Sequence, residues 1–517
     1  MKAQVLIIGG GATGTGISRD LALRGINCIL VEKKDINAGA SGGNHGLLHS
    51  GARYVGADPE AAEECKHEGD IIKKVAPHCI ENTGGLFVAV AGDDEKYIAD
   101  FPQNCSKCGV PAKYVDLKDA FELEPELAKN TIAVYMVEDA SVDPFKLSLE
   151  NLSHAHSNGT IYLPYTKAEG FNIENGRIKS VVVQNMITGE QKKIEADYVV
   201  NAAGVWAGEL AKLAGMKINM IYSKGSLLVT QRRITKRVIN RLRRASDADI
   251  LVPGGTVSII GTTSIRTESL ESIYPTVEEV DFIISEGAQM LPLLDKIRYI
   301  RAYSGVRPLV SLHDSADDRG VTRGFALIDH EKEGIKNFTT ITGGKLTTFR
   351  LMAEKTSDHV CEKLGISKPC MTKTVPMPNT SSGRWTEPGL APKTWVRDSS
   401  KADILLCECE MIPKSAIDSI ISSIIGQSGD LSLNSIGVRS RVGKGPCQGT
   451  FCSARIVSYM YDKGNLIDKQ GILELQKFIN ERWKGQRPLL WDIPMVQSEL
   501  QEAIHCGLFG LEMEQNK

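Results

Sequence analysis

The sequence of 517 residues predicts a chain of mixed α/β and α+β architecture with a small helical domain at its C-terminal end. Three features support this prediction. A glycine-rich turn lies between two apolar segments at residues 5–32, and another apolar segment runs into small residues at 197–206. Four cysteines are grouped near the C-terminus, beyond a proline-containing stretch. The first two features predict a nucleotide-binding sheet, and the third predicts a separate metal centre.

Charge and hydropathy exclude several classes of protein. The 61 basic and 63 acidic side chains give a formal net charge of -2, so nucleic acid is not an expected partner. No apolar run approaches the roughly 20 residues that cross a bilayer. The first eight residues lack the cleavage pattern of a signal peptide. We therefore expect a cytoplasmic protein whose twelve cysteines are reduced or act as ligands.

The N-terminal segment has every part of a dinucleotide-binding unit. Residues 5–8 are apolar, as in a strand buried on both faces, and residues 9–14 match the pattern G-x-G-x-x-G. A helical pattern follows, and a second strand at 28–31 ends at Glu32. The glycines let backbone approach a pyrophosphate, and the acid accepts hydrogen bonds from ribose. The alternative is a glycine-rich turn without a ligand. The residues expected to contact the nucleotide are Gly9, Gly11, Ala12, Thr13, Gly14, Glu32 and Lys33.

Two further segments favour FAD over NAD. Residues 197–206 are an apolar strand that runs into small residues, and they resemble the second nucleotide-contacting strand of the glutathione-reductase-like FAD fold. Residues 40–46 form another loop of small residues, suited to backbone that wraps around an isoalloxazine. The residues expected to contact FAD from these segments are Ser41, Gly42, His45, Gly46, Ala203, Gly204 and Trp206.

Five motifs in the first 360 residues occur in a characteristic order. They lie at residues 49–54, 142–145, 260–263, 303–309 and 343–350. Together they resemble the FAD-dependent glycerol-3-phosphate dehydrogenases. The resemblance implies an FAD domain interleaved with a substrate domain, as in the DAO-like oxidoreductases. It also implies oxidation of sn-glycerol 3-phosphate by hydride transfer to the flavin.

Arginines in the motifs suit a phosphorylated substrate, because the guanidinium group matches phosphate oxygens bidentately. The resemblance implies that Arg53, Tyr54, Arg307 and Arg323 bind glycerol 3-phosphate. The alternative for any single arginine is a surface ion pair. One departure is that Leu227 follows Lys224-Gly225-Ser226, where the membrane-bound single-subunit relatives carry a histidine.

The resemblance also implies residues for chemistry beside the flavin. Arg307 and Lys345 provide positive charge, which at Lys345 stabilises the reduced flavin. His49 is the candidate base for the substrate hydroxyl, because an imidazole titrates near neutral pH. Its alternative role is packing against the flavin edge. The residues implied at the flavin by the last motif are Gly343, Gly344, Lys345, Leu346 and Thr347.

Two segments outside these motifs have less specific patterns. Residues 231–244 contain seven basic residues and no acid, with rough helical spacing. We expect a solvated helix face there, and the alternative is a patch for anionic lipid or a partner subunit. Cys105 and Cys108 have the spacing of a redox pair, but they are expected in a turn-like segment and are interpreted as incidental.

The C-terminal third is predicted to hold a linker and a small domain. We expect an oxidoreductase part at 1–370, a proline-rich linker at 371–400, a cysteine domain at 401–460 and a helical tail at 461–517. Isoleucines at helical spacing predict an amphipathic helix that begins near Pro413 and ends at Gly426.

Four cysteines in two close pairs predict a metal centre in the small domain. The ligands are Cys407, Cys409, Cys447 and Cys452, and their spacing alone leaves Zn²⁺ and an iron–sulfur cluster open. The C-x-C and G-x-C-Q-G-x-x-C patterns resemble the bacterioferritin-associated-ferredoxin-like [2Fe-2S] domain. Basic residues at 439, 441 and 444 would offset the negative charge of the thiolates.

The tail at residues 478–512 resembles that of the large subunits of anaerobic glycerol-3-phosphate dehydrogenases. This resemblance implies two partners. One is a second flavoprotein subunit, and the other is a membrane-anchoring iron–sulfur subunit that delivers electrons to a quinone, indirectly menaquinone. It also implies a peripheral position at the inner face of the cell membrane. The alternatives are an FAD dehydrogenase of another small hydroxy or amino acid, and a non-catalytic electron-transfer subunit with structural zinc.

Overall fold

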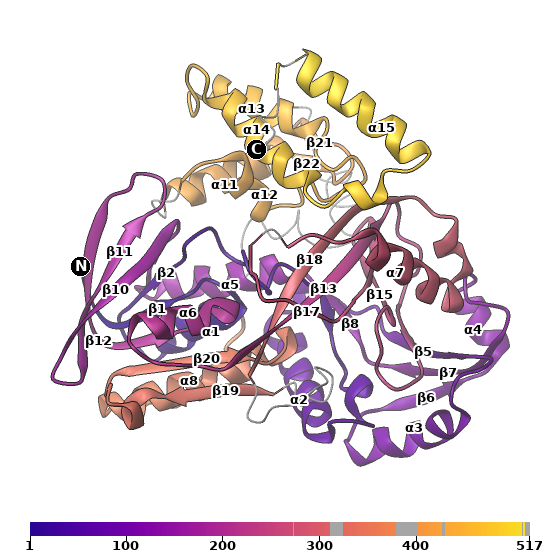
Figure 1. Ribbon diagram of the computed structural model, residues 1–517, viewed down its shortest axis with the longest axis horizontal. Helices are drawn as coiled ribbons and strands as arrows, with labels where there is room; N and C mark the ends of the chain where they lie inside the picture. Colours follow the sequence, from indigo (N-terminus) through magenta and orange to yellow (C-terminus); the bar gives the residue numbers. More distant parts are fainter. Residues whose placement is uncertain (272, 311–323, 379–401, 427–429, 509, 512–517) are drawn as a thin grey trace.

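The computed structural model describes residues 1–517 except 272, 311–323, 379–401, 427–429, 509 and 512–517 (Figure 1). Its first large sheet has the strand order β10-β11-β12-β1-β2-β9, with β20 paired to β12 and β19 paired to β20. The strands β1, β2, β9, β12 and β20 run parallel. These strands are β1 (Lys2–Ile8), β2 (Cys28–Val31), β9 (Ile161–Leu163), β10 (Thr166–Glu174), β11 (Arg177–Asn185), β12 (Gln191–Asn201), β19 (Phe325–Asp329) and β20 (Phe338–Gly343).

Strand β1 is buried on both faces of this sheet, as its apolar run predicts. Val5 and Ile7 face one core, together with side chains of α1 (Ala12–Leu23), α5 (Pro144–Ser157) and α8 (Phe349–Leu364). The alternate residues Leu6 and Ile8 face a second core, which includes β11 and α6 (Ala207–Leu213). The period of two along the strand therefore produces the layers on either side of the sheet.

A second large sheet is built from segments inserted between those of the first. Its order is β17-β13-β16-β15-β14-β5-β7-β6, with β18 paired to β13. Helix α7 (Val277–Met290) contributes to the core on this sheet. The strands are β5 (Gly85–Val90), β6 (Ala112–Val115), β7 (Thr131–Val137), β13 (Met220–Thr230), β14 (Val238–Arg241), β15 (Ile250–Gly254), β16 (Val257–Gly261), β17 (Ile265–Arg266) and β18 (Tyr299–Val310).

Shorter elements connect the two sheets. A three-stranded sheet has the order β3-β8-β4 and consists of β3 (Leu47–Leu48), β8 (Ala140–Val142) and β4 (Ile80–Glu81). The remaining helices of this part are α2 (Pro59–Val75), α3 (Glu95–Lys107) and α4 (Leu117–Leu123). Because the chain crosses repeatedly between the sheets, the predicted interleaving of two structural units is observed.

The C-terminal elements form a separate layer, seen together at the top of Figure 1. All of them except the last helix contribute to one apolar core that includes Cys407, Cys452 and Phe478. The predicted amphipathic helix is present as α11, and of its isoleucines only Ile425 is exposed. These elements are β21 (Leu405–Cys407), β22 (Ile412–Pro413), α11 (Lys414–Gly426), α12 (Leu433–Val438), α13 (Cys452–Asp462), α14 (Gln470–Trp483) and α15 (Ile493–Glu502).

The basic run at 231–244 is not a helix, so that expectation is wrong. Its centre is strand β14, which pairs with β5 and β15. Arg241 forms an ion pair with Asp93 at 2.7 Å, and Arg243 one with Asp249 at 2.8 Å. The charges are therefore used inside the fold, where acids from distant segments meet them.

Two other local expectations differ from the structure. Cys105 is buried in the last turns of α3 rather than in a turn-like segment, and Cys108 caps that helix in the same apolar core. The first part of the expected linker is packed: Met377 is 4% exposed and donates to the carbonyl of Val75, and Arg19 donates to that of Val375. The later linker prolines lie outside the described residues.

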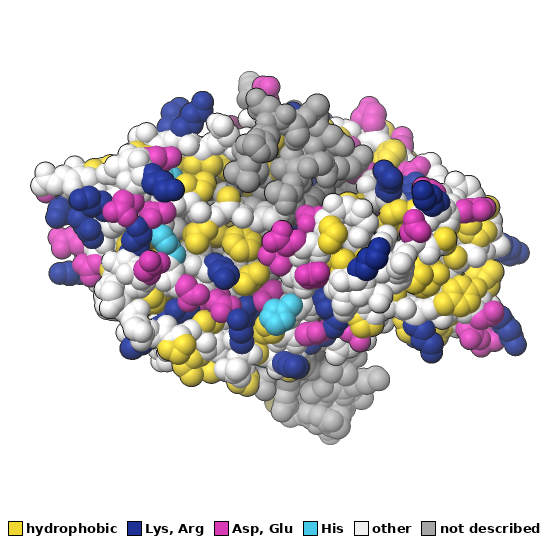
Figure 2. Space-filling model, turned by 90° about the horizontal axis from the view of Figure 1, so that it is seen from below, with side chains coloured by type: hydrophobic (Ala, Val, Ile, Leu, Met, Phe, Trp, Pro, Cys, Tyr) yellow, Lys and Arg dark blue, Asp and Glu magenta, His cyan; other side chains and the backbone are white. Residues whose placement is uncertain are grey.

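The surface shows charge of both signs. On the face in Figure 2, lysine and arginine side chains alternate with aspartate and glutamate, without a field of a single sign. Within the described ranges, no helix is both long and apolar enough to span a bilayer.

Candidate active site and thiol cluster

The first turn of the chain forms a backbone cradle at the start of α1. Gly9 has a φ of +119°, and a Cβ there would lie 2.4 Å from the carbonyl oxygen of Ala202. A Cβ on Gly14 would lie 1.9 Å from the carbonyl oxygen of Gly9. The amide of Ala12 donates to Ser41 Oγ at 3.0 Å, and the first helical turn carries no acidic side chain. The amide dipoles at this helix start therefore favour a phosphate.

Glu32 completes this unit at the end of β2. Its carboxylate accepts hydrogen bonds from the amides of Gly10, at 2.7 Å, and Lys34, at 2.9 Å. Burial raises the pKa of Glu32, and the two amide hydrogen bonds act against that rise. Lys33 Nζ lies 3.5 Å from the centre of the Trp206 ring. The acid is thus held in one orientation at the cavity wall.

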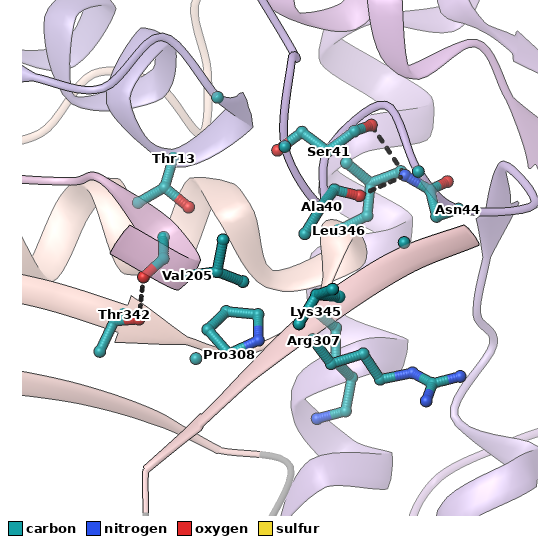
Figure 3. Close-up of a pocket in the computed structure, with 18 of the residues that line it drawn as sticks. Thr13, Ala40, Ser41, Asn44, Val205, Arg307, Pro308, Thr342, Lys345 and Leu346 are labelled. Carbon is teal, nitrogen blue, oxygen red and sulfur yellow. Dashed lines mark hydrogen bonds between the residues drawn. The ribbon is translucent and has the colours of Figure 1, made fainter. Parts of the chain in front are cut away.

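Both large sheets contribute residues to a cavity of about 990 Å³. Figure 3 shows Thr13, Val205 and Thr342 on one side, and Arg307 and Lys345 on the other. Ligand pockets usually measure about 300–1,000 Å³, so this cavity suits a molecule of dinucleotide size. The predicted residues that line it are Gly9, Gly11, Ala12, Thr13, Glu32, Lys33, Ser41, His45, His49, Arg53, Tyr54, Ala203, Gly204, Trp206, Arg307, Gly343, Gly344, Lys345 and Leu346.

Four predicted cofactor contacts lie behind the lining, which corrects their expected role. Gly14 packs on Gly9, and Gly42 has backbone of Asn37 where a Cβ would be. Gly46 has a φ of +70° and packs beside Val142. The hydroxyl of Thr347 accepts a hydrogen bond from the His49 amide at 3.1 Å. These residues shape the lining rather than form it. Arg323 lies outside the described residues.

Arg307 extends from β18 into the cavity. Its guanidinium donates to the hydroxyl of Thr262, to the carbonyl of Thr263 at 3.0 Å and to Ser223 Oγ at 3.4 Å. Gly225 on the adjacent strand leaves room for it, because a Cβ there would lie 2.6 Å from Arg307 Nη2. The glycine in the Lys-Gly-Ser segment is therefore a steric requirement of the arginine.

A second arginine follows the histidine motif, on a 3-10 turn at Ala52–Tyr54. Arg53 donates to the carbonyl of Ser246 at 2.9 Å and to Asp249 Oδ2 at 3.3 Å. The loop that receives it also brings Arg244 and Asp247 to the cavity. Sequence reasoning missed this loop as part of the site. The only available signal was its position at the end of the basic run.

His49, Tyr54 and Lys345 lie together at the same end of the cavity. Tyr54 Oη is 3.5 Å from His49 Nε2, and Lys345 Nζ lies 4.9 Å from the centre of the Tyr54 ring. The two histidines are also neighbours, with ring centres 6.3 Å apart. Burial, with the charges of Arg307 and Arg53, lowers the pKa of His45 to about 3. His45 is therefore neutral near pH 7.

The four predicted cysteine ligands are brought together in the C-terminal layer. Cys409 Sγ lies 3.7 Å from Cys407 Sγ and 3.6 Å from Cys447 Sγ. Cys452 is near enough to Cys407 and Cys447 for the three thiols to affect one another's pKa. In the described part of the chain, no group of three or more His, Cys, Asp or Glu is arranged so that it already could hold a metal ion. The four form a compact group of thiols, called the thiol cluster below.

One thiol of the cluster is activated by its surroundings. Hydrogen bonds from the thiols of Cys409 and Cys452, and from the amides of Gly449 and Phe451, lower the pKa of Cys447. Cations surround the group: Arg441 forms an ion pair with Glu410 at 2.5 Å, and burial lowers the pKa of Lys444 to about 8. A thiolate is the form that binds metal, so this environment suits a ligand.

The sequence of the chain is similar to those of known proteins over nearly its whole length. It is 41% identical to the A subunit of the anaerobic glycerol-3-phosphate dehydrogenase of Escherichia coli (strain K12), over 99% of this chain and 98% of that protein. It is 36% identical to the A1 subunit of the same enzyme from Haloferax volcanii, over 98% and 90% of the two chains. The chain belongs to the family of anaerobic glycerol-3-phosphate dehydrogenase A subunits.

The chain also matches a broader family of oxidoreductases, which is consistent with a cavity of dinucleotide size. Residues 4–358 match the family described as FAD dependent oxidoreductase. The glycerol-3-phosphate dehydrogenase of Bacillus halodurans, solved with FAD, has a TM-score of 0.59 at 23% identity, covering 99% of this chain and 92% of that one. Glycine oxidase of Geobacillus kaustophilus has a TM-score of 0.57 at 18% identity, covering 73% and 99%. At these identities the solved structures show the shared fold alone.

Proposed function

We propose that the chain oxidises sn-glycerol 3-phosphate to dihydroxyacetone phosphate, with FAD as the hydride acceptor. The observation that carries this proposal is the group of cations at one end of the cavity, where Arg53, Arg244, Arg307 and Lys345 converge with His49. A phosphate ester carries close to two negative charges at pH 7, and arginine pairs with it bidentately. The names of the relatives support the same substrate.

The residues present fit FAD. The glycine cradle accepts backbone-close phosphates at α1, and Glu32 faces the cavity beside it for ribose hydroxyls. In the described part of the chain, His45 Nδ1 is buried without a hydrogen-bond partner although it faces the same cavity. Buried polar atoms are normally satisfied, so this nitrogen supports a ligand beside it. Gly343, Gly344 and Leu346 form the remaining wall.

The chain's own residues account for binding and proton movement. Arg307 and Arg53 bind the phosphate and thereby fix the position of the carbinol carbon. His49 takes the hydroxyl proton at Nε2, the nitrogen that lies 3.5 Å from Tyr54 Oη. Tyr54 orients that imidazole, and Lys345 beside it keeps positive charge near the reacting end.

The test of this function is direct. Anaerobic addition of glycerol 3-phosphate to the flavin-loaded protein is expected to bleach the flavin absorbance. An unchanged spectrum at millimolar substrate overturns the proposal. Bleaching by a small hydroxy or amino acid, with glycerol 3-phosphate inert, would instead support the alternative FAD dehydrogenase.

We further propose that the thiol cluster binds a [2Fe-2S] cluster through which electrons leave the chain. Support comes from the four sulfurs, the cations at 441 and 444, and the need for a one-electron carrier after a two-electron oxidation. The alternative, structural zinc, also has an observation in its favour. Tetrahedral Zn–S bonds of about 2.3 Å place sulfurs about 3.8 Å apart, close to the separations here. Analysis of iron and sulfide against zinc decides between them.

Partners and location complete the proposal. The relatives are named as subunits of their enzyme, which supports a multisubunit assembly. We propose a second flavoprotein subunit, together with a membrane-anchoring iron–sulfur subunit that passes electrons to menaquinone, and a peripheral position of this chain at the inner face of the membrane. Co-purification of the three chains from membranes tests this. Recovery of this chain alone, free of membranes, under low-salt lysis contradicts it.

A further inference from the structure

The C-terminal layer is attached to the loop that follows Glu32, on the nucleotide side of the cavity. Arg439 in the C-terminal layer forms an ion pair with Asp35 at 2.5 and 3.1 Å, and both side chains are buried. Asp35 also accepts a hydrogen bond from Tyr162 at 3.3 Å. A buried charge that lost this partner would be strongly unfavourable. The attachment is therefore a fixed one.

A second attachment joins the layer to the substrate sheet. Glu410 accepts hydrogen bonds from Arg441 at 2.5 Å and from Thr256 at 2.6 Å. Arg441 also donates to the carbonyl of Gly254 at 3.3 Å. Glu410 follows Cys409 directly in the chain. One end of the thiol cluster is thus anchored to the turn between β15 and β16.

A third contact of the C-terminal layer reaches a residue that packs on the loop at 40–46. Lys444 Nζ lies 4.2 Å from the centre of the Phe145 ring. The same ring packs on the loop at Gly42, where a Cβ would be 3.0 Å from Phe145 Cζ. That loop supplies Ser41 and His45 to the cavity. One aromatic ring therefore contacts the cavity loop on one side and the C-terminal layer on the other.

The residue that follows Lys444 packs against the thiol cluster. It is Gly445, and a Cβ on Gly445 would lie 2.7 Å from Cys409 Sγ. Only two residues separate Lys444 from Cys447. On its other flank, Arg482 donates to the carbonyl of Gly443 at 2.6 Å and holds this backbone in place. The Lys444 side chain thus contacts Phe145, and its backbone continues into the segment that packs against the thiol cluster.

We propose that the Phe145–Lys444 contact is the path by which electrons pass from the flavin side to the thiol cluster within one chain, with Lys444 as a positioning residue. This inference rests on the proposed function. Each substrate oxidation releases two electrons and two protons. FAD held in the cavity would supply these electrons one at a time to a [2Fe-2S] cluster held by the four cysteines, the protons would go to water, and a quinone-linked acceptor would take the electrons from the cluster.

The charge of Lys444 has a second consequence at the same place. Four thiolates give the centre a net negative charge that increases when an electron arrives. A cation beside the sulfurs opposes that increase and raises the reduction potential of the centre. Lys444 therefore contacts Phe145 and also raises the driving force for electron transfer to the centre.

The test compares variants of the full holoenzyme. We expect Lys444→Met to leave anaerobic bleaching of the flavin at the parental rate and to slow the appearance of the reduced iron signal at least tenfold. The midpoint potential of the centre, titrated with dyes rather than by turnover, should become more negative. Lys444→Arg should restore the potential. Lys463→Met is the control, because Lys463 also lies over an aromatic ring, Tyr459, at 5.4 Å, but at the far end of α13 from Cys452.

The outcomes distinguish a failure of the proposed electron path from a failure of the proposed function. Parental iron reduction in Lys444→Met overturns the path. If the parental protein contains no iron, or if glycerol 3-phosphate does not bleach its flavin, both the proposed function and the path are wrong. Should Lys444→Met lose its iron, Phe145→Leu decides, because that residue lies outside the C-terminal layer. There the rate of iron reduction divided by the rate of bleaching is expected to fall at least tenfold, and an unchanged ratio contradicts the path.

Discussion

At the scale of single residues, the site depends on cations held by hydrogen bonds and on space left by glycine. Gly225 leaves room for the guanidinium of Arg307, whose hydrogen bonds to Thr263 and Ser223 fix its direction. The sequence motifs named Arg307 correctly as a cavity residue. They could not show what orients it, because those partners lie on other strands.

Replacing Arg307 tests its role in phosphate recognition. Each charge-assisted hydrogen bond contributes roughly 1.5–3 kcal/mol, so Arg307→Ala should lower kcat/KM for glycerol 3-phosphate by about 10- to 150-fold. Activity with glycerol, which has no phosphate, should change far less. Steady-state kinetics with both substrates measure this preference. Arg266→Ala on the exposed strand β17 is the control, and an equal loss there would refute a specific role.

His45 gives a prediction about pH. Its pKa is about 3 in the folded protein, because the site is buried and faces Arg307 and Arg53, whereas an unfolded histidine titrates near 6.5. Between those values the unfolded state binds one more proton, so this group destabilises the fold as pH drops below about 6.5. From pH 7.5 to 5.5 the loss is about 1.4 kcal/mol.

Removing the imidazole should remove that loss. In the flavin-free protein, the free energy of unfolding of His45→Gln relative to the parent should rise by about 1.4 kcal/mol between pH 7.5 and 5.5. Urea denaturation at the two pH values measures the difference. His67→Gln, on the exposed face of α2, should show no such trend. A pH-independent difference for His45→Gln would show that the imidazole is protonated in the fold.

At the scale of elements, ion pairs decide where the sequence pattern misleads. Residues 231–244 have helical spacing, yet they form β14 because its edges pair with β5 and β15 and its arginines meet acids from other segments. Local spacing contains no information about those partners. In contrast, α11 follows its apolar periodicity closely, since it buries one face on a nearby core.

The Asp35–Arg439 pair predicts how firmly the C-terminal layer is attached. Arg439→Met leaves Asp35 charged and buried without its partner, which should destabilise the protein by about 3–5 kcal/mol. Calorimetry should show the melting of the C-terminal layer at lower temperature. Glu408 and Arg455 form an exposed pair, so Arg455→Met should cost about 0–1 kcal/mol. Equal losses of stability in the two variants would show that the Asp35–Arg439 pair does not hold the C-terminal layer in place.

At the scale of the whole molecule, the cavity exists only because the chain crosses between two sheets. Its walls combine the glycine turn at 9–14, the loop at 40–46, the strand end at 202–206, β18 and the turn at 343–346. Motif order along the sequence was sufficient to predict most of these segments. The loop at 244–247 and the contact of Asp35 with Arg439, 404 residues away, were not predictable, because nothing local marks them.

For the whole molecule we also predict that the flavin cavity and the thiol cluster act in series. Cys447 is the thiol whose pKa is lowered by its neighbours, so Cys447→Ser should prevent assembly of the [2Fe-2S] cluster and abolish the low-temperature paramagnetic signal of the reduced protein. Flavin bleaching by glycerol 3-phosphate should persist, because none of the described residues of the C-terminal layer lines the cavity. Transfer to an external acceptor should slow markedly. Cys506 lies outside the thiol cluster, so Cys506→Ser is the control. If acceptor reduction by Cys447→Ser matches that of the parent, electrons leave directly from the flavin and the cysteines have a structural role.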